Sequence, residues 1–379
     1  MRQIYLDYNA TTPVAPTVFE AMRPFLTDHF GNPSSGHVLG RACSQAIEDA
    51  RESVAMLLGA ASDEIIFTGT GTEANNLALK GVCQEADRFA GHIVISSIEH
   101  PAVKEPASYL NRMGCQLTVV GTDERGIVDP HAVEAAIRED TKIVSIMHAN
   151  NEIGSIQPIQ EISKICRRHK VLLHTDAAQS IGKIRTDVDE LGVDLLTLAG
   201  HKLYAPKGIG ALYVRCGIPL QPVLHGAGHE QGLRPGTENT PYIVALGAAA
   251  KLAARSLPEN ADRIARLRNL LQSGLEDAIP GITFNGHRDH CLPNTLSVNF
   301  PRVSGYYLLN RCPEVLASTG AACHSGTEHI SDTLHSIGLT QSKAMGTIRL
   351  SLGWNTSEED VQRATSAMIS AWESLTADA

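Results

Sequence analysis

Between about residues 63 and 215, short apolar runs alternate with longer amphipathic segments. The segments at 72–89 and 159–170 place apolar residues at helical spacing. The apolar runs have the length of strands, and they are EIIFTG at 64–69, HIVISS at 92–97, KIVSIMHAN at 142–150, VLLHTDAA at 171–178, DLLTLAG at 194–200 and GALYVR at 210–215. Strands that alternate with helices predict a mostly parallel sheet covered by helices on both faces.

Beyond about residue 250 the pattern changes to short strands between two long helical stretches. The elements predicted there are a helix at 259–279, strands at 282–286, 295–300 and 347–353, and a final helix from Ser357. We therefore expect a large α/β domain over residues 15–250. Residues 1–14 and 251–379 are expected to form a smaller α+β domain.

Polar residues follow five of the predicted strands, at the point where each strand ends. They are Gly69 to Glu73, Glu99 and His100, Asn150 and Asn151, Asp176, and His201 and Lys202. In parallel α/β sheets, ligands bind beyond the carboxyl ends of the strands. The pattern therefore predicts a single crevice that these residues line.

The composition narrows the possible functions. The 379 residues are 43% hydrophobic and 19% charged, with a formal net charge of -9. Such a charge favours neither nucleic acid nor a membrane surface as a partner, and no apolar run approaches the roughly 18 residues of a spanning helix. The cysteines are scattered without a C-x-x-C pair, and the first residues lack a signal-peptide pattern. We therefore expect a cytoplasmic protein.

Lys202 needs a physical reason, because burying an ammonium at a strand end costs free energy unless it is paired or neutralised. Asp176 lies 26 residues upstream, at the end of the preceding strand. The pair suits pyridoxal phosphate, which needs an amine for a Schiff base and a carboxylate that keeps its pyridine nitrogen protonated. Taken separately, a surface lysine and a helix-capping aspartate are the ordinary interpretations.

The run TGTGTEANN at 68–76 offers a glycine-containing turn that leads into a helix. Backbone N–H groups near Gly71 and the Thr72 hydroxyl could bind the cofactor's phosphate at this helix start. Many turns of this kind only cap a helix, and the run is neither a Walker loop nor a dinucleotide fingerprint.

Four further residues could serve the cofactor or its substrate. His100 could lie against the cofactor ring or act as an acid or base, while Asn150 and Gln179 could hydrogen-bond its phenolic oxygen. A structural histidine and turn-forming amides are the alternatives. Arg349 in TIRLSLG could bind an α-carboxylate, or it could simply cover the sheet.

Cys323 lies in ASTGAACHSG at 317–326, a run of small residues that we expect to form a mobile loop with an exposed thiol. A thiolate there could reach a bound substrate and then a partner. The alternatives are an incidental small residue and a metal site. The possible metal ligands are His324, His329 and His335 near this run, and the pairs His225/His229 and His287/His290. The spacing of the first three with Cys323 fits no common zinc pattern, and the two pairs lie in loop-like contexts, so we expect no metal.

Together these residues resemble the pyridoxal-phosphate-dependent cysteine desulfurases of the NifS-like branch of the class V aminotransferase family. The resemblance covers essentially the whole chain through ordered blocks, namely YLDYNATTP, FGNPSSGH, FTGTGTEANNLALKG, EHPAV, MHANNEIG, HTDAAQS, GHKLYAPKGIGALYVR, RPGTENTP, GAACHSG and IRLSLG. It implies the fold type I architecture, with a large cofactor-binding domain and a smaller domain that carries the catalytic cysteine.

The resemblance also implies roles for individual residues. Lys202 would form the Schiff base, His100 would stack on the ring and move protons, and Cys323 would be the nucleophile. The cofactor would further contact Asp176, Asn150, Gln179, Gly71, Thr72, His201 and, from the other subunit of a homodimer, Thr237. Arg349 and Asn150 would bind the substrate. L-cysteine would become L-alanine, and a persulfide on Cys323 would pass sulfur to an acceptor such as an iron–sulfur scaffold protein.

Two departures from the family pattern keep alternatives open. Ala199 replaces a serine that usually binds the phosphate in the bacterial desulfurases. The run GAACHS resembles the selenocysteine lyases, so a selenocysteine lyase is the main alternative, and His324 could lower the pKa of the Cys323 thiol. A class V aminotransferase without a role for the cysteine and a non-catalytic scaffold are the other functions considered.

Overall fold

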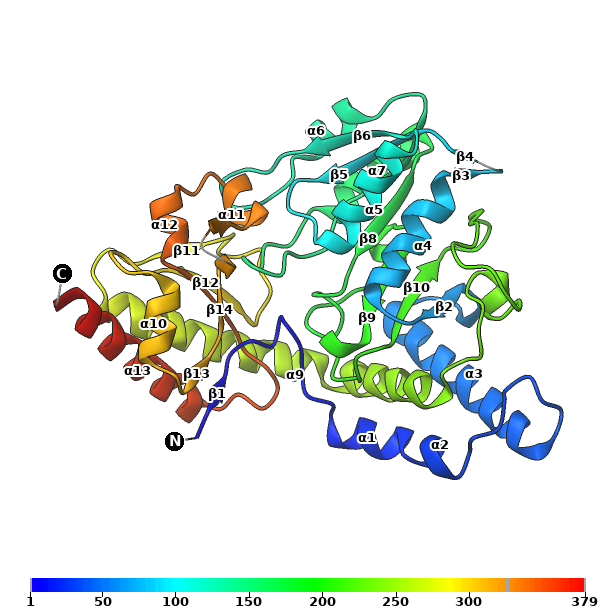
Figure 1. Ribbon diagram of the computed structural model, residues 1–379, viewed down its shortest axis with the longest axis horizontal. Helices are drawn as coiled ribbons and strands as arrows, with labels where there is room; N and C mark the ends of the chain where they lie inside the picture. The colour runs from blue at the N-terminus through cyan, green and yellow to red at the C-terminus, as the bar shows by residue number, and fades with distance from the viewer. Residues whose placement is uncertain (1, 87, 325–326, 378–379) are drawn as a thin grey trace.

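A seven-stranded sheet forms the centre of the larger part of the molecule (Figure 1). The computed structural model describes residues 2–86, 88–324 and 327–377, and the side chains of 321–324 and 327–329 lie outside that description. In sheet order the strands are β2 (Ile65–Thr68), β10 (Gly210–Val214), β9 (Leu195–Ala199), β8 (Leu172–Asp176), β7 (Thr141–Ser145), β5 (His92–Ser96) and β6 (Gln116–Val120). Only β10 pairs antiparallel, with β2 and β9, so the mostly parallel sheet expected from the sequence is confirmed.

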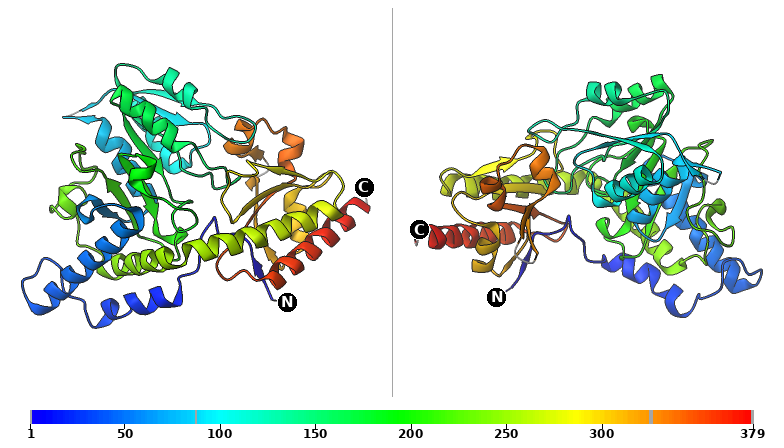
Figure 2. Two further views of the ribbon diagram at one scale, coloured as in Figure 1. Left: turned by 180° about the vertical axis from the view of Figure 1, so that it is seen from behind. Right: turned by 45° about the horizontal axis from the view of Figure 1, so that its top comes forward.

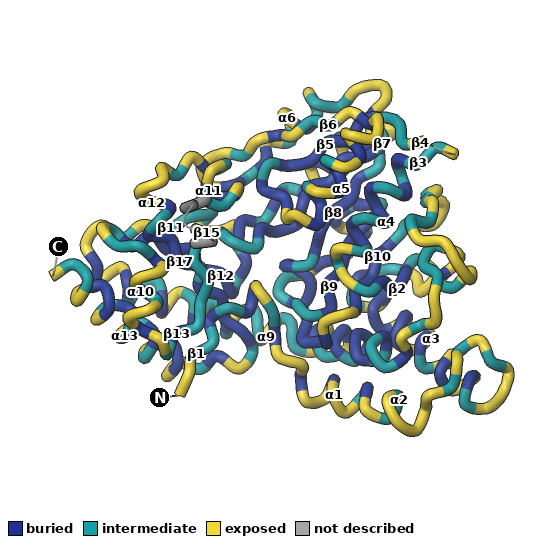
Figure 3. Tube along the Cα trace, in the orientation of Figure 1, coloured by how far each residue is buried: buried dark blue, intermediate teal, exposed yellow. Residues whose placement is uncertain are grey.

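Helices cover both faces of this sheet, because alternate residues of each strand point to opposite sides. The helices of the large part are α1 (Pro16–Met22), α2 (Pro24–Thr27), α3 (Val38–Leu58), α4 (Gly71–Cys83), α5 (Pro101–Arg112), α6 (Pro130–Ala136), α7 (Ile159–His169) and α8 (Val188–Leu191), with short 3-10 turns η1 (Ser62–Glu64), η2 (Gly200–Lys202) and η3 (Glu230–Gly232). Ile65 and Phe67 of β2 pack in one core cluster with α3 and α7, whereas Ile66 packs in another with α4 and α5. Figure 3 shows the strands buried between these layers.

A four-stranded antiparallel sheet forms the smaller part, in the order β11 (Thr283–Asn285), β12 (Thr295–Asn299), β17 (Thr347–Ser351) and β14 (Ser318–Thr319). The helices there are α10 (Gly305–Arg311), α11 (Asp332–Ser336), α12 (Gln341–Met345) and α13 (Glu358–Ala377). The first strand of the chain, β1 (Ile4–Tyr5), pairs in parallel with β13 (Val315–Leu316). The beginning of the chain therefore packs in the core of the smaller part, with Ile4 and Leu6 in its apolar cluster.

One continuous helix, α9 (Thr240–Ala278), runs along both parts (Figure 2). Its buried residues up to Ala253 join the large core, and those from Ile264 onward join the small core. The sequence predicted this helix only from residue 259, and the boundary expected near residue 250 falls inside it. The alanine-rich run before Pro258 lacks an amphipathic period, and a proline ordinarily interrupts a helix. The sequence pattern therefore did not predict that one helix continues through Pro258.

Two local predictions differ from the structure. The helix expected over 72–89 ends at Cys83, and the chain then forms the hairpin β3 (Gln84–Glu85) and β4 (Arg88–Phe89). Where a loop was expected around Cys323, the backbone forms β15 (Ala321–His324), antiparallel to β16 (Thr327–Ile330). The composition of this run did not indicate a strand, but small side chains do not prevent the backbone from pairing.

Within the described part of the chain, no helix is both long and apolar enough to cross a membrane.

A buried ion pair fixes the loop that precedes α9. Arg51 of α3 donates two parallel hydrogen bonds of 2.8 Å to the Glu230 carboxylate, and the two side chains are only 10% and 2% exposed. Glu230 also accepts from the backbone N–H of Phe67, at 2.7 Å. Glu230 and Gln231 both have positive φ angles, of 48° and 57°, which non-glycine residues seldom adopt. The ion pair therefore stabilises a strained turn.

Removing the charge from this pair should destabilise the fold strongly. We expect Glu230→Gln to lower the free energy of unfolding by about 3 kcal/mol, because the buried Arg51 guanidinium loses its counter-charge. Urea unfolding of the apoprotein measures the change. The matched control is Glu20→Gln, which removes the charge from an exposed pair with Arg23 and should change stability by less than about 1 kcal/mol. Equal effects in the two variants would contradict this account of the turn.

Candidate functional site

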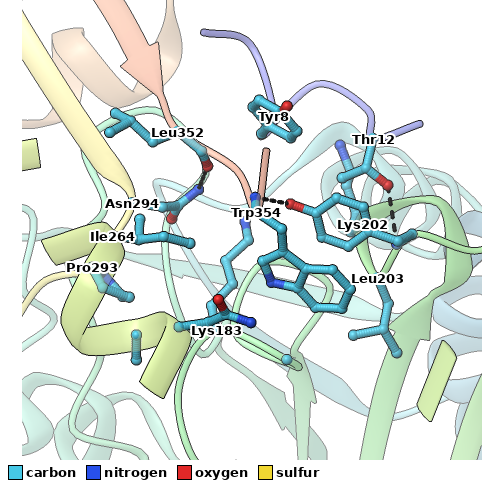
Figure 4. Close-up of a pocket in the computed structure, with 14 residues that line it drawn as sticks. Tyr8, Thr12, Lys183, Lys202, Leu203, Ile264, Pro293, Asn294, Leu352 and Trp354 are labelled. Atoms are coloured by element: carbon cyan, nitrogen blue, oxygen red, sulfur yellow. Dashed lines mark hydrogen bonds between the residues drawn. The ribbon is translucent and has the colours of Figure 1, made fainter. Parts of the chain in front are cut away.

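Lys202 lies at the end of β9 against the N-terminal segment, where its ammonium meets backbone carbonyls. Its Nζ donates to the carbonyl oxygens of Asn9, at 2.5 Å, and Ala10, at 2.7 Å. Figure 4 shows Lys202 and Lys183 among the residues that line a small pocket between the two parts of the molecule. The pocket encloses about 20 Å³, which is room for about one water molecule.

The electrostatic surroundings of Lys202 make its amine unusually easy to deprotonate. Burial is the largest cause and the positive charge of Arg349 the next, and together they lower the pKa of Lys202 from 10.5 to about 8. The carboxylates of Asp176 and Asp7 act in the opposite direction. A lysine with such a pKa has a substantial neutral, nucleophilic fraction near neutral pH.

Asp176 ends β8, the strand next to β9, as the sequence predicted. Its side chain is buried, and its two carboxylate oxygens accept hydrogen bonds from Asn75 Nδ2, at 2.7 Å, and from the Ala178 N–H, at 2.9 Å. Asn75 comes from α4, and its Oδ1 atom is buried without a hydrogen-bond partner. A carboxylate with two fixed bonds keeps lone pairs free to accept from a further donor.

Gln179 shares an acceptor with Lys202. Its Nε2 donates to the carbonyl oxygen of Asn9 at 3.0 Å, and its Oε1 accepts from Lys183 at 2.7 Å. Lys183 also donates to Asn9 Oδ1, at 2.9 Å. Burial, followed by the charges of Lys202 and Arg349, holds the pKa of Lys183 well below its ordinary value. The sequence reasoning missed Lys183, although it lies only four positions after Gln179.

His100 and Asn150 flank the crevice from the ends of β5 and β7. His100 caps α5, with its Nδ1 accepting from the Ala102 N–H at 3.1 Å. The surrounding protein desolvates the imidazole and lowers its pKa, while the charge of Asp176 raises it. Asn150 is fully buried, and its Nδ2 donates to Ile98 O, at 3.2 Å, and to Thr333 Oγ1 of α11, at 3.3 Å. Its amide thus connects the crevice to the segment that follows Cys323.

The residues predicted to bind the cofactor's phosphate lie at the start of α4 and just after β9. Thr70 caps α4, which leaves the first-turn N–H groups at Gly71 and the exposed Thr72 facing outward. A Cβ atom at Gly71 would lie 3.0 Å from the Ala199 methyl group, so the departure at Ala199 adjoins this helix start. His201 Nδ1 lies 3.2 Å from Thr11 Oγ1, and burial lowers the pKa of His201 to about 4.

Arg349 of β17 reaches toward the crevice from the smaller part. Its Nη2 donates to Asp7 Oδ1 at 2.6 Å and to Ser318 Oγ at 3.0 Å, and its Nη1 donates to Asn151 O at 3.2 Å. Asn151 and Ser318 line a cavity of about 410 Å³ with Arg349. Asp7 was not among the predicted site residues, because nothing near it in the sequence indicates an arginine partner.

The described contacts do not bring Thr237 into the crevice, and they do not include the side chains of two further predicted residues. Thr237 is exposed on the loop before α9. The side chains of Cys323 and His324 lie outside the described residues, so the nucleophile and its neighbour stay predictions. Among the residues that are described, no group of three or more histidine, cysteine, aspartate or glutamate side chains could hold a metal ion.

Comparisons with known proteins agree with this geometry. A family model described as aminotransferase class-V matches residues 4–364. The chain is 46% identical over 362 residues to the cysteine desulfurase IscS of Dictyoglomus turgidum, and the match covers 95% of this chain and 92% of that relative. A solved NifS-like protein superposes with a TM-score of 0.91 at 38% identity, covering 97% of this chain and 98% of its own.

A second solved structure, described as SspA in complex with cysteine, has a TM-score of 0.82 at 38% identity and covers 92% of this chain and 98% of its own. The family resemblance and the fold predicted from the sequence are thereby confirmed. The names of these relatives favour a cysteine desulfurase, and nothing in the comparisons favours a selenocysteine lyase.

The pKa of Lys202 can be tested by its reactivity. We expect acetic anhydride labelling of Lys202 in the apoprotein, followed by peptide mass spectrometry, to rise with pH through a midpoint near 8, since the neutral amine is the reactive form. Arg349→Gln should raise that midpoint, because it removes a repelling positive charge. Asp176→Asn should lower it, because it removes an attracting negative charge. A wild-type midpoint near 10.5, unchanged in both variants, would refute this description of the site.

Proposed function

Because the chain belongs to the class V aminotransferase family, we propose that it is a pyridoxal-phosphate-dependent cysteine desulfurase that forms L-alanine from L-cysteine and keeps the sulfur on Cys323 as a persulfide. The observation that carries the proposal is Lys202, whose pKa is lowered to about 8 and whose charge environment includes the buried Asp176 on the neighbouring strand. These two groups meet the requirements of the cofactor that this family uses.

The described residues fit this cofactor. Asp176 has free lone pairs for a pyridinium N–H, and the nearby Asn75 Oδ1 is a buried acceptor without a donor. Lys202 supplies the amine that would hold the aldehyde carbon, and the start of α4 at Gly71 and Thr72 supplies donors for a phosphate. Asn150, Gln179, His100 and His201 would complete the binding site. When bound, the cofactor supplies an electron sink that acidifies the substrate Cα–H.

The chain's own residues supply the remaining chemistry. Arg349 would bind the substrate carboxylate, with Asn150 beside it, and so orient the amino acid in the crevice. The neutral amine of Lys202 is suited to take the Cα proton, since its lowered pKa leaves a basic fraction at neutral pH. His100 has a lowered pKa as well, and the neutral imidazole can accept the thiol proton of L-cysteine or return it.

Sulfur transfer requires a nucleophile, which we assign to Cys323. Its thiolate would attack the substrate Sγ, so that an S–S bond forms as the Cβ–Sγ bond breaks, and the bonding electrons stay with carbon. Protonation of that carbon skeleton yields L-alanine. The Asn150 side chain donates from Nδ2 to the Ile98 carbonyl oxygen and to Thr333 Oγ1, and so connects the crevice to α11, just beyond the Cys323 segment.

The assembly and the destination of the sulfur are part of the same proposal. A homodimer in which the partner's Thr237 completes the phosphate site would explain why Thr237 is exposed on a loop anchored by the Arg51–Glu230 pair. An acceptor thiol on another protein, such as an iron–sulfur scaffold, would take the persulfide sulfur. We place this reaction in the cytoplasm, where such acceptors are made and thiols stay reduced.

Two variants separate cofactor binding from sulfur transfer. We expect Lys202→Ala to lose the near-ultraviolet to visible absorbance band that the wild type gains with pyridoxal phosphate, and to form no alanine from L-cysteine. Cys323→Ser should keep the band but lose alanine formation by at least about 100-fold, because the nucleophile is gone. Mass spectrometry of the Cys323 peptide should detect one added sulfur atom in the wild type after a single turnover.

The exposed Cys216 provides the thiol control, and Cys216→Ser should retain full activity. L-selenocysteine is assayed in parallel. Turnover confined to L-selenocysteine would contradict the desulfurase proposal. Alanine formation that survives Cys323→Ser when a keto acid is added would instead identify an aminotransferase.

A further inference from the structure

Asp7 contacts the proposed substrate arginine, yet no step of the proposed reaction uses it. Its Oδ1 accepts from Arg349 Nη2 at 2.6 Å and from Ser318 Oγ at 2.9 Å. The two charged side chains are 12% exposed at Arg349 and 20% exposed at Asp7. A charge-assisted hydrogen bond of this length, shielded from water, is among the stronger contacts that a side chain can make.

The hydrogen bonds of Arg349 leave part of its guanidinium available. An arginine has five N–H donors, and the described contacts of Arg349 engage donors on Nη1 and Nη2 with Asn151, Asp7 and Ser318. The remaining nitrogen, Nε, is buried without an acceptor. A buried donor without an acceptor costs free energy, so the arrangement is incomplete until a ligand supplies one. A carboxylate oxygen is a suitable acceptor for a guanidinium N–H.

Charge repulsion explains why Arg349 needs an anchor. Its positive charge lowers the pKa of both Lys202 and Lys183, so the guanidinium lies within electrostatic reach of two other cations. Without an anion in contact, a flexible arginine would relax away from those lysines toward water. Asp7 is the carboxylate that forms an ion pair with it, and it is itself fixed because the flanking β1 pairs with β13.

We propose that Asp7 is a positioning residue that holds the Arg349 guanidinium in place and keeps its free N–H groups available for the carboxylate of an α-amino acid. This inference rests on the proposed function, in which Arg349 binds the substrate. It predicts that Asp7 acts on substrate binding only through Arg349. The opposite arrangement, in which Asp7 competes with the substrate for Arg349, predicts tighter binding when Asp7 is removed.

The test compares steady-state alanine formation from L-cysteine in the holoenzyme and four variants. Asp7→Asn keeps the shape of the side chain and removes its charge, and we expect KM to rise roughly tenfold while kcat stays within about threefold. Ser318→Ala is the matched control, because it removes a neutral partner of the same nitrogen, and KM should rise by no more than about threefold. Arg349→Gln should raise KM more than Asp7→Asn does.

The double variant Asp7→Asn/Arg349→Gln decides whether Asp7 acts through Arg349. We expect its KM to equal that of Arg349→Gln within about twofold, since an arginine that is absent cannot be positioned. A purely structural role of Asp7 would instead add a further loss, visible in kcat and in thermal stability. If Asp7→Asn does not fold, Asp7→Glu, which keeps the charge but displaces it, should give the same KM effect and the same lack of additivity.

The outcomes distinguish this inference from the proposed function. Wild-type protein that forms no alanine from L-cysteine overturns the proposed function. An unchanged KM in Arg349→Gln overturns the role of Arg349 and this inference with it. A normal or lowered KM in Asp7→Asn, alongside a raised KM in Arg349→Gln, overturns the positioning role of Asp7 alone.

Discussion

The site depends on the cost of burying three positive charges in one crevice. Burial and the charge of Arg349 lower the pKa of both lysines, and the charge of Lys202 lowers that of Lys183 further. Anionic and polar acceptors around these side chains offset part of this cost. Asp7 pairs with Arg349, and backbone and amide oxygens accept from the lysines. What remains is a neutral amine fraction close to a guanidinium, which suits a site for an anionic cofactor and a substrate carboxylate.

The N-terminal segment makes this arrangement possible, because it connects the two cores through Asn9. The Asn9 carbonyl accepts from Lys202 and Gln179, and its side chain donates to Thr295 of β12 at 2.8 Å and accepts from Asn294 at 3.0 Å. One buried residue therefore bonds the lysine of the large part to the sheet that carries Arg349. Together with the continuous helix α9, it sets the distance between Lys202 and Arg349.

Much of the site could be predicted from the sequence, for a local reason. Asp176, Asn150 and Lys202 each follow a buried apolar run, and the ends of parallel strands meet at one edge whatever the rest of the chain does. The contacts that tune these residues could not be predicted in that way. Asp7 and Arg349 are 342 positions apart, and Asn9 and Lys202 are 193 apart, so no local pattern relates them. The long helix was missed in part for the same reason, since its alanine-rich half is stabilised by packing against α3 instead of by an amphipathic period.

The sequence by itself determined the chemistry that the crevice can perform, because the residue types and their places after strands are local properties of the chain. It determined the alternation of strands and helices, and hence the parallel sheet, through hydrophobic periodicity. Only the tertiary structure decided the electrostatics of the crevice. Burial, the approach of Arg349 to Lys202 and Lys183, and the pairing of Arg349 with Asp7 all arise when two cores and the N-terminal segment pack together. Long-range Coulomb and desolvation energies depend on those distances, which a one-dimensional pattern does not contain.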